Sequence, residues 1–432
     1  MSNGNKILII SYYWPPSSGG GVPRVVKFAK YLLRNGYEPY VVTYGGNYKH
    51  EDYSFLKDVE GVKVFKTKTQ IKKKPIEKTN LKKQANPKVS LISRLNDRVK
   101  RFIRINFLIP DRRILWYPQA LDKCKELISE NQFNCFITTS PPYTVQLVGL
   151  KLKSKFNLKW ISDFRDPWSE NVYYNSGFRF GLSKNINNIL EKKVLQNADL
   201  IITVGEKLSS LLKSKTNTPI KVITNGFDKE DYESRGSKIK EEYFYLGYYG
   251  SLNEHQIFIS FFEKLKSFEK SNKELYDKIK LRFSGNNTAE ALNLIKQNFP
   301  KDKIEFLGYL NHDEFVKEIS KSQILLQFIH NQNDGEVIIG SKLYEYLFTG
   351  NKILCLDPLN SEGGELVKSL ATGLTINPFD DLSVLEAFLS TEYIEWKEKT
   401  QNNFDYTNIL RFEREQLTMD LIKNIESLKD EE

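Results

Sequence analysis

The first fifty residues place a short apolar strand, a glycine-rich turn, a helix and a second strand in succession. Lys6–Ser11 is an apolar run of strand length, and Tyr40–Thr43 is another. Between them, the loop Gly19–Gly21 precedes a segment, Val22–Leu33, whose apolar residues recur at helical spacing. Parallel strands joined by a crossover helix are buried on both faces. The sequence therefore predicts a βαβ unit of a doubly wound parallel sheet.

The same alternation begins again in the second half of the chain, so we predict two α/β domains. A chain of 432 residues exceeds one ordinary domain. The predicted N-terminal domain covers residues 1–228, and a linker rich in both signs of charge covers 229–243. The second domain covers 244–390. Residues 391–432 carry apolar positions at helical spacing and are predicted to form the C-terminal helices.

Cysteine usage and hydropathy indicate the compartment. Cys124, Cys135 and Cys355 show neither metal-ligand spacing nor an even disulfide framework, which favours a reducing environment. The apolar run at the N-terminus is too short for a secretory leader, and no run reaches the length of a membrane span. We expect a cytoplasmic protein without a metal site.

The net charge of +10 is concentrated in one segment. Residues 63–113 hold seventeen lysines and arginines against three acidic residues, so the segment is more positive than the whole chain. Within it, residues 89–107 place apolar side chains on one helical face and basic ones on the other. Two interpretations remain open: a helix at an anionic membrane surface, and a core-packed helix with a solvated basic face. Nucleic acid is disfavoured, because no binding motif is present.

Polar residues follow the predicted strand Lys159–Ser162. Asp163, Arg165 and Asp166 would lie at the carboxyl end of a parallel strand, which is the functional edge of an open α/β sheet. An internal ion pair that closes the turn is the alternative.

Gly340–Gly350 is predicted to form a helix, and the apolar run Asn351–Leu356 after it is predicted to form a buried strand. Lys342 lies near the helix start, where backbone N–H groups also favour an anion, and Glu345 follows one turn later. A lysine there suits a diphosphate, and a carboxylate suits a pair of sugar hydroxyls. A solvated Lys–Glu surface pair is the alternative.

Three motifs together resemble one enzyme family. Residues 140–142 read S-P-P, residues 162–168 read S-D-F-R-D-P-W, and residues 342–347 contain K-L-x-E-Y-L. This pattern resembles the retaining, glycogen-synthase-like GT-B glycosyltransferases, a glycosyltransferase family four-like group. The resemblance implies an α/β fold of two Rossmann-like domains facing across a cleft, with a C-terminal helix crossing back to the first domain.

The resemblance also implies a reaction and a set of site residues. A sugar would pass from a nucleotide-sugar donor to a saccharide or lipid-linked acceptor, with retention and without a metal or cofactor, in bacterial surface polysaccharide biosynthesis. The implied catalytic residues are Lys342, Asp163, Arg165 and Asp166. The implied substrate-binding residues are Gly19, Gly20, Gly21, Arg24, Gln146, Gly250, Ser251, Gly285, Ser341 and Glu345.

The sequence also departs from the family pattern. Tyr143 and Gln146 stand where the related proteins often have histidines, and Asn253–Gln256 replaces their phosphate-binding cations. Val337 stands where a first glutamate is common, with Glu336 one place off. A catalytically weak or regulatory relative is therefore the alternative function. A nicotinamide oxidoreductase is disfavoured, because the G-x-G-x-x-G fingerprint is missing.

Overall fold

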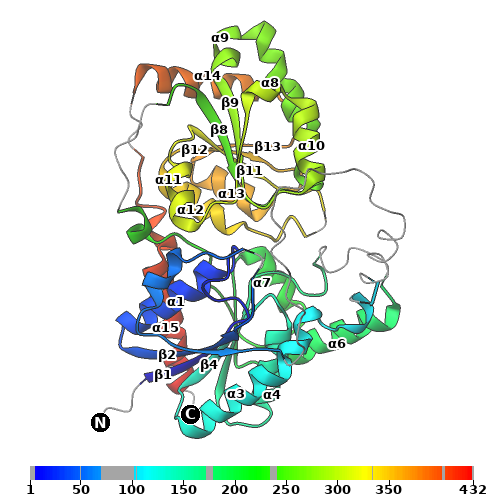
Figure 1. Ribbon diagram of the computed structural model, residues 1–432, viewed down its shortest axis with the longest axis vertical. Helices are drawn as coiled ribbons and strands as arrows, with labels where there is room; N and C mark the ends of the chain where they lie inside the picture. Colours follow the sequence, from blue (N-terminus) through cyan, green and yellow to red (C-terminus); the bar gives the residue numbers. More distant parts are fainter. Residues whose placement is uncertain are drawn as a thin grey trace.

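The computed structural model of the chain describes residues 5–48, 50–69, 102–103, 105–171, 179–233, 241–332, 334–400 and 404–430. Two α/β domains are stacked along the long axis of the molecule, with the N-terminal domain below and the second domain above in Figure 1. This arrangement confirms the predicted fold of two Rossmann-like domains.

The first domain is built on a parallel sheet of order β3-β2-β1-β4-β5-β6-β7. The chain order reverses between β1 and β4, which pair through Ile7 with Cys135 and Ile9 with Ile137. Ligands in such sheets bind at the carboxyl ends of the strands beside this switch point. The strands are β1 Asn5–Ile10, β2 Tyr37–Tyr44, β3 Lys63–Thr67, β4 Cys135–Ser140, β5 Lys159–Phe164, β6 Leu200–Thr203 and β7 Ile220–Val222.

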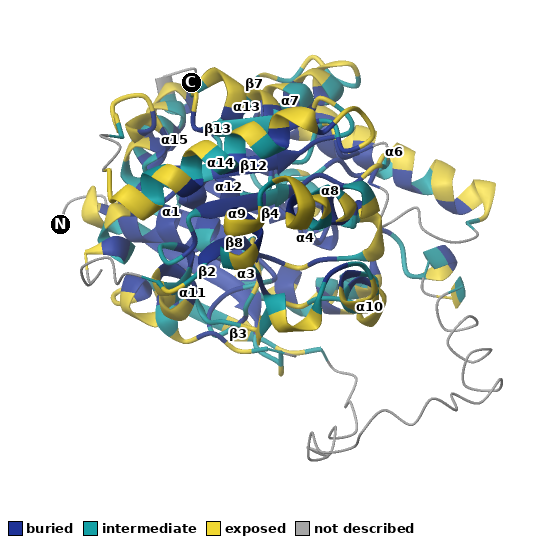
Figure 2. Ribbon diagram, turned by 90° about the horizontal axis from the view of Figure 1, so that it is seen from above, coloured by how far each residue is buried: buried dark blue, intermediate teal, exposed yellow. Residues whose placement is uncertain are grey.

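Helices cover both faces of this sheet. One face packs against α1 and the C-terminal helix α15 (Arg414–Asp430), and the other packs against α3, α4 and neighbouring helices. The helices are α1 Val22–Arg34, α3 Tyr117–Glu130, α4 Thr144–Lys153, α6 Gly181–Asn197 and α7 Glu206–Lys213. Buried on both faces, the strands consist mostly of apolar residues. Figure 2 shows these buried strands beneath helices whose outer faces are exposed.

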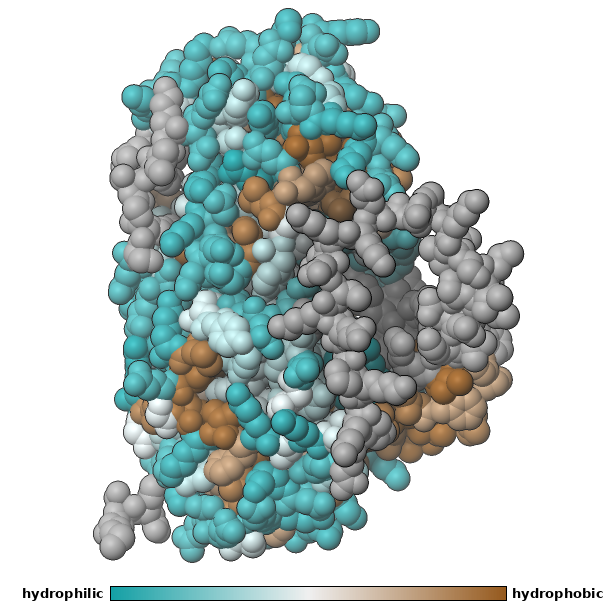
Figure 3. Space-filling model, in the orientation of Figure 1, coloured by the Kyte–Doolittle hydropathy of each residue, from teal (hydrophilic) through white to brown (hydrophobic). Residues whose placement is uncertain are grey.

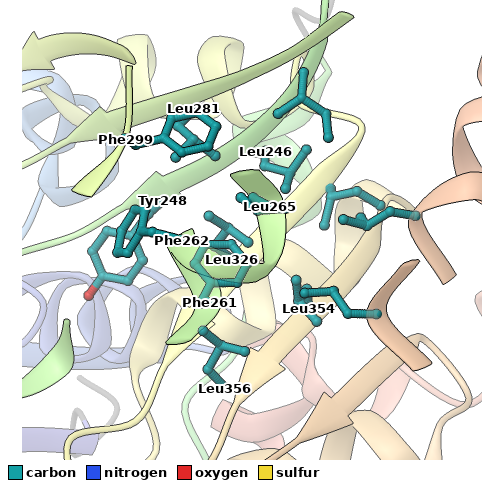
Figure 4. Packing of buried hydrophobic residues seen from close by; sticks show 14 of the residues in the cluster. Leu246, Tyr248, Phe261, Phe262, Leu265, Leu281, Phe299, Leu326, Leu354 and Leu356 are labelled. Carbon is teal, nitrogen blue, oxygen red and sulfur yellow. The ribbon is translucent and has the colours of Figure 1, made fainter. Parts of the chain in front are cut away.

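The second domain repeats the pattern with a parallel sheet of order β10-β9-β8-β11-β12-β13. Leu246, Leu326 and Leu354 from three of its strands meet Phe261 and Phe262 of α8 in the core (Figure 4). The strands are β8 Phe244–Tyr249, β9 Ile279–Ser284, β10 Ile304–Gly308, β11 Ile324–Phe328, β12 Lys352–Leu356 and β13 Gly373–Ile376. The helices are α8 Ile259–Ser271, α9 Lys273–Lys278, α10 Ala289–Asn298, α11 His312–Ile319, α12 Ser341–Thr349, α13 Glu362–Ser369 and α14 Ser383–Glu398.

The chain crosses between the domains twice, and the two crossings pair with each other. The Phe227 N–H donates to the Phe412 carbonyl at 3.1 Å, and the Arg414 N–H donates to the Phe227 carbonyl at 2.8 Å. After this bridge, α15 (Arg414–Asp430) packs on α1 through Leu421 and Ile425. The predicted return of the C-terminal helix to the first domain is therefore confirmed.

One predicted boundary falls inside a helix. The predicted division at residues 390–391 falls inside α14, whose Tyr393 packs in the core of the second domain. Most of the predicted amphipathic segment 89–107 and part of the linker lie outside the described residues. Short 3₁₀ helices complete the description: η1 Ser54–Val59, η2 Arg112–Trp116, η3 Lys229–Tyr232, η4 Glu254–Gln256, η5 Lys301–Lys303 and η6 Leu410–Phe412. No helix in the described ranges is long and apolar enough to cross a membrane.

Candidate functional site

The glycine-rich loop of the first domain lies against the start of α12 in the second domain. A Cβ atom added at Gly20 would lie 3.1 Å from the Ser341 Oγ. A Cβ at Gly21 would lie 1.7 Å from an Nη atom of Arg165, which no side chain could tolerate. Gly19 has φ +123, a conformation that favours glycine. The loop therefore brings backbone, and no side chains, to the junction of the domains.

Helix α12 places Lys342 at this junction. The helix begins after Gly340 and ends at Gly350, whose φ of 72° is left-handed, as the stop signal predicts. The Lys342 Nζ lies 2.8 Å from the position that a Cβ of Gly250 would occupy, just after β8. Gly285, with φ +127, packs closely against Gly250 and Ser251. A Cβ atom added at Gly285 would lie 2.1 Å from the Gly250 carbonyl oxygen and 3.1 Å from the Ser251 nitrogen.

The Lys342 ammonium has the electrostatics of an anion-binding group. Within the described part of the chain, it has no hydrogen-bond or ion-pair partner. Burial lowers the pKa of Lys342 to about 8, and the charge of Glu345 only partly opposes this effect. The first N–H groups of α12 lie beside it, at the positive end of the helix dipole. A phosphate or diphosphate would satisfy the cation and the helix end together.

Glu345, unlike Lys342, is hydrogen-bonded to protein side chains. One oxygen of its buried carboxylate accepts hydrogen bonds from the Tyr232 hydroxyl at 2.9 Å and from the His312 Nε2 at 3.3 Å. Burial alone would raise the pKa of Glu345, but His312 and Tyr232 lower it below its ordinary value. The carboxylate is thus held by η3 and α11, and it forms no solvated surface pair with Lys342.

Asp163 and Arg24 form a buried ion pair with each other. The Arg24 Nε and Nη2 lie 3.1 and 3.0 Å from the two Asp163 oxygens, and both side chains are at most 1% exposed. Thr139 also donates to Asp163, and Arg24 donates to the Thr224 carbonyl. This geometry is that of the internal ion pair considered as the alternative, and it leaves neither group facing a substrate.

The side chain of Gln146, like that of Asp163, is hydrogen-bonded within the protein. Its amide nitrogen donates to the Ser140 Oγ at 2.9 Å and the Asp163 carbonyl at 3.0 Å, and its oxygen accepts from Ser162 at 2.8 Å. Tyr143 is fully buried and stacks on Trp168. The two positions where related proteins often carry histidine therefore serve to join β4, α4 and the end of β5. Neither side chain reaches a substrate in this conformation.

Arg165 and Asp166 do reach the junction. Arg165 donates to the carbonyls of Ser140 at 2.9 Å and Pro141 at 2.8 Å, which leaves Nη1 against Gly21. Burial lowers the pKa of Arg165. Burial also raises the pKa of Asp166; Arg165 opposes this shift, and Asp334 of the second domain adds to it. Among the described residues, the Asp166 carboxylate has no hydrogen-bond partner.

Asp166 opens into a cavity of about 310 Å³ in the first domain. The cavity lies between the loops that follow β1, β4 and β5, and helix η2. Its lining residues are Tyr13, Asp111, Arg112, Arg113, Pro141, Pro142, Asp166 and Asn171. In the sequence, Arg112 and Arg113 are part of the basic segment 63–113, and two adjacent arginines are the signal that could have pointed to this cavity. Tyr13 and Asn171 carried no such signal.

One acidic cluster has the spacing of a metal site but is already neutralised. Asp58, Asp228 and Asp231 bring carboxylate oxygens within 4.8 Å of one another. The Lys27 ammonium lies 2.7 to 2.8 Å from an oxygen of each, and Lys30 adds a second cation. These lysines take the place that a divalent cation would need.

A comparison with protein families matches the first domain. Residues 18–231 match the model of the family described as Glycosyltransferase Family 4. A comparison with the curated proteins gives no match.

Solved structures of the same fold cover nearly the whole chain. The sucrose-phosphate synthase of Thermosynechococcus elongatus is 13% identical, with 99% of this chain and 100% of that chain covered and a TM-score of 0.65. An E. coli structure described as trehalose-6-phosphate bound with UDP-2-fluoro glucose is 12% identical, with 97% and 98% covered and a TM-score of 0.60. TarM is 10% identical, with 98% of both chains covered and a TM-score of 0.58. The shared fold and the matched family model support a GT-B glycosyltransferase.

Proposed function

We propose that this protein transfers a sugar from a nucleotide-sugar donor to a saccharide or lipid-linked acceptor, with retention and without a metal. The observation that carries the proposal is the Lys342 ammonium, which lies at the start of α12, against Gly250, without a protein partner in the described residues. The matched family model over residues 18–231 supports the same activity. We further propose that the product belongs to a bacterial surface polysaccharide.

The chemistry needs a place for the departing nucleoside diphosphate. As the glycosidic bond breaks, the sugar carbon becomes cation-like and negative charge grows on the leaving phosphate. Lys342 and the N–H groups of α12 would stabilise that charge from the second domain, and Arg165 would do so from the first. The glycine loop Gly19–Gly21 lets backbone approach closely, and Asp166 faces the acceptor side. Burial of the site between the domains limits hydrolysis of the donor.

The proposed location is the cytoplasm, with peripheral attachment to an anionic membrane. Exposed apolar side chains on α6, together with the exposed Ile103 and Phe107, support the attachment.

Replacing Lys342 tests the proposal directly. With a panel of nucleotide sugars, we expect Lys342→Ala to lower turnover about 10²- to 10³-fold, the usual cost of removing a group that stabilises transition-state charge. Thermal unfolding should change little, since the variant removes a buried charge without a partner. Lys368→Ala, at an exposed position on α13, is the matched control. Unchanged turnover in Lys342→Ala would contradict this role.

The lowered pKa of Lys342 adds a pH dependence. Because its free ammonium loses its proton near pH 8, the affinity of the wild type for the nucleoside diphosphate UDP should fall as the pH rises through about 8. Titration calorimetry should show no such step in Lys342→Ala. Binding of the nucleotide without release of any sugar from the panel would favour the second candidate, a regulatory relative. That candidate rests on the buried, fully bonded Gln146 and Tyr143.

A further inference from the structure

We propose that the acceptor carries an anionic group, a phosphate ester or diphosphate, which Arg113 and Arg112 bind in the cavity beside Asp166. The inference rests on the proposed function and names the class of its acceptor. The two arginines and Asp166 line the same cavity, so an anion and a nucleophilic hydroxyl of one molecule can be held together there.

Arg113 is fixed in position before any ligand arrives. The centre of its guanidinium lies 4.6 Å from the Tyr12 ring centroid and 5.7 Å from that of Tyr13. Its Nη2 donates to the Tyr13 hydroxyl at 3.0 Å. A planar guanidinium held in this way loses little side-chain entropy when it binds an anion, and its fork of donors matches phosphate geometry.

The positive charge of Arg113 is not cancelled by a salt bridge. Within the described ranges, no carboxylate lies within ion-pair distance of its side chain. Asp111 lines the same cavity, but its carboxylate accepts hydrogen bonds from the Thr144 N–H at 3.0 Å, the Thr144 hydroxyl at 2.9 Å and the Arg113 backbone N–H at 2.8 Å. Asp111 therefore joins η2 to α4. The guanidinium keeps its remaining donors for a ligand.

The volume of the cavity limits how large a part of the acceptor can enter it. A volume of about 310 Å³ is at the lower end for ligand pockets, which span roughly 300–1,000 Å³. It suits one sugar unit with its phosphate. The anion would therefore be attached to the sugar that is glycosylated.

The phosphate has two chemical sources, a soluble sugar phosphate and a lipid phosphate. Titration calorimetry on the full chain would use glucose 6-phosphate and geranyl phosphate as anionic probes, and methyl glucoside as a neutral one. We expect at least one anionic probe to bind at least ten-fold more tightly than methyl glucoside. The preferred probe then identifies the source. Equal affinities, or no binding of either phosphate, would overturn the proposal.

Variants locate the site. Arg113→Gln should weaken binding of the preferred phosphate at least ten-fold, and Arg112→Gln, at an exposed position, should weaken it without disturbing the fold. Arg411→Gln is the matched control, because this exposed arginine lies outside the cavity. Phosphate affinity that persists in both cavity variants would overturn the proposal.

A phosphate probe can also bind the donor side, so the titrations are repeated in Lys342→Ala. The inference requires the affinity for the preferred phosphate to persist there and to fall again when Arg113→Gln is added. The affinity for UDP should stay unchanged in Arg113→Gln. If the wild type does not bind UDP at all, the proposed function itself is contradicted. Failure of the acceptor-phosphate proposal and failure of the proposed function therefore give different results.

Discussion

At the scale of single residues, Asp163 is predicted to be catalytic from its place in the sequence, and in the structure both of its carboxylate oxygens are bound within the protein. It follows a buried strand at the functional edge of the sheet, but its oxygens are taken by Arg24 and Thr139. Asp166, three positions later, keeps a carboxylate without a hydrogen bond from the described residues and opens into the cavity. The motif S-D-F-R-D-P-W therefore contains one anchor and one candidate for substrate contact.

Because Asp163 pairs with the buried Arg24, replacing it should destabilise the fold. Asp163→Asn would leave the Arg24 guanidinium buried beside a neutral partner, and we expect the free energy of unfolding to fall by about 3–5 kcal/mol. Urea denaturation monitored by tryptophan fluorescence measures it. Asp313→Asn, which removes an exposed ion pair with Lys57, should change stability by less than about 1 kcal/mol. A stable Asp163→Asn variant without turnover would restore a catalytic role for Asp163.

At the scale of elements, α6 carries an apolar face that the protein leaves exposed. Leu182, Ile186 and Ile189 share one side of the helix, and Leu182 is 73% exposed. Phe180, at the start of the helix, packs edge-on against Phe102, and Phe107 lies exposed beyond it. Figure 3 shows this apolar surface at the lower right. An exposed apolar patch in a chain that also carries a strongly basic segment is typical of a membrane-contacting surface.

Vesicle sedimentation tests this surface. The wild type should bind vesicles containing anionic lipid more strongly than neutral ones, because residues 63–113 are strongly basic. Leu182→Ser should weaken binding about ten-fold or more, since burying a leucine side chain contributes about 1.5–3 kcal/mol. Ile394→Ser, exposed on α14 of the other domain, should bind like the wild type. Absence of binding to both kinds of vesicle would rule out the attachment.

At the scale of the whole molecule, hydrogen bonds and ring contacts both join the two domains, and Phe55 of the first domain lies against the His312 ring of the second. The Glu362 carboxylate of the second domain accepts from the N–H groups of Glu206 at 2.6 Å and Lys207 at 3.0 Å, at the start of α7. On the other side, the His312 N–H donates to Asp52 at 3.0 Å. His312 thus lies where the first domain, the linker helix η3 and α12 meet.

The surroundings of His312 predict a pH-dependent stability. Glu345 lies 3.3 Å from its Nε2 and Asp231 lies 3.9 Å from its Nδ1, with Asp52 at its backbone and Lys27 nearby. Burial alone would lower the pKa of His312, but the two carboxylates raise it above its ordinary value. A raised pKa stabilises the fold below about pH 6.5, and this contribution is lost as the pH rises through the folded-state value.

Denaturant unfolding at several pH values would measure this effect. Relative to His312→Gln, the wild type should lose stability as the pH rises above about 6.5, by about 1.4 kcal/mol for each unit by which the folded-state pKa is raised. His255→Gln, at an exposed position, should follow the wild-type profile. Parallel pH profiles for the wild type and His312→Gln would contradict the prediction.

Much of the fold could be predicted from the sequence, because the signals are local. Apolar runs of strand length marked β1 and β12, helical periodicity marked α1, and Gly350 marked the end of α12 through its left-handed conformation. These features depend on neighbours within one or two turns of the chain.

Only the tertiary structure decided which predicted polar residues already have partners within the protein, because those partners are distant in sequence. Arg24 and Asp163 are 139 positions apart, and Tyr232 and Glu345 are 113 apart. No local pattern distinguishes a carboxylate that meets such a partner from one that does not, and hydrogen bonding in a buried place decides which groups remain available. The sequence alone determined two parallel sheets and the place of Lys342 at a helix start. The tertiary structure shows that Asp163, Arg24 and Gln146 are hydrogen-bonded within the protein, and that Arg113 lines the cavity beside Asp166.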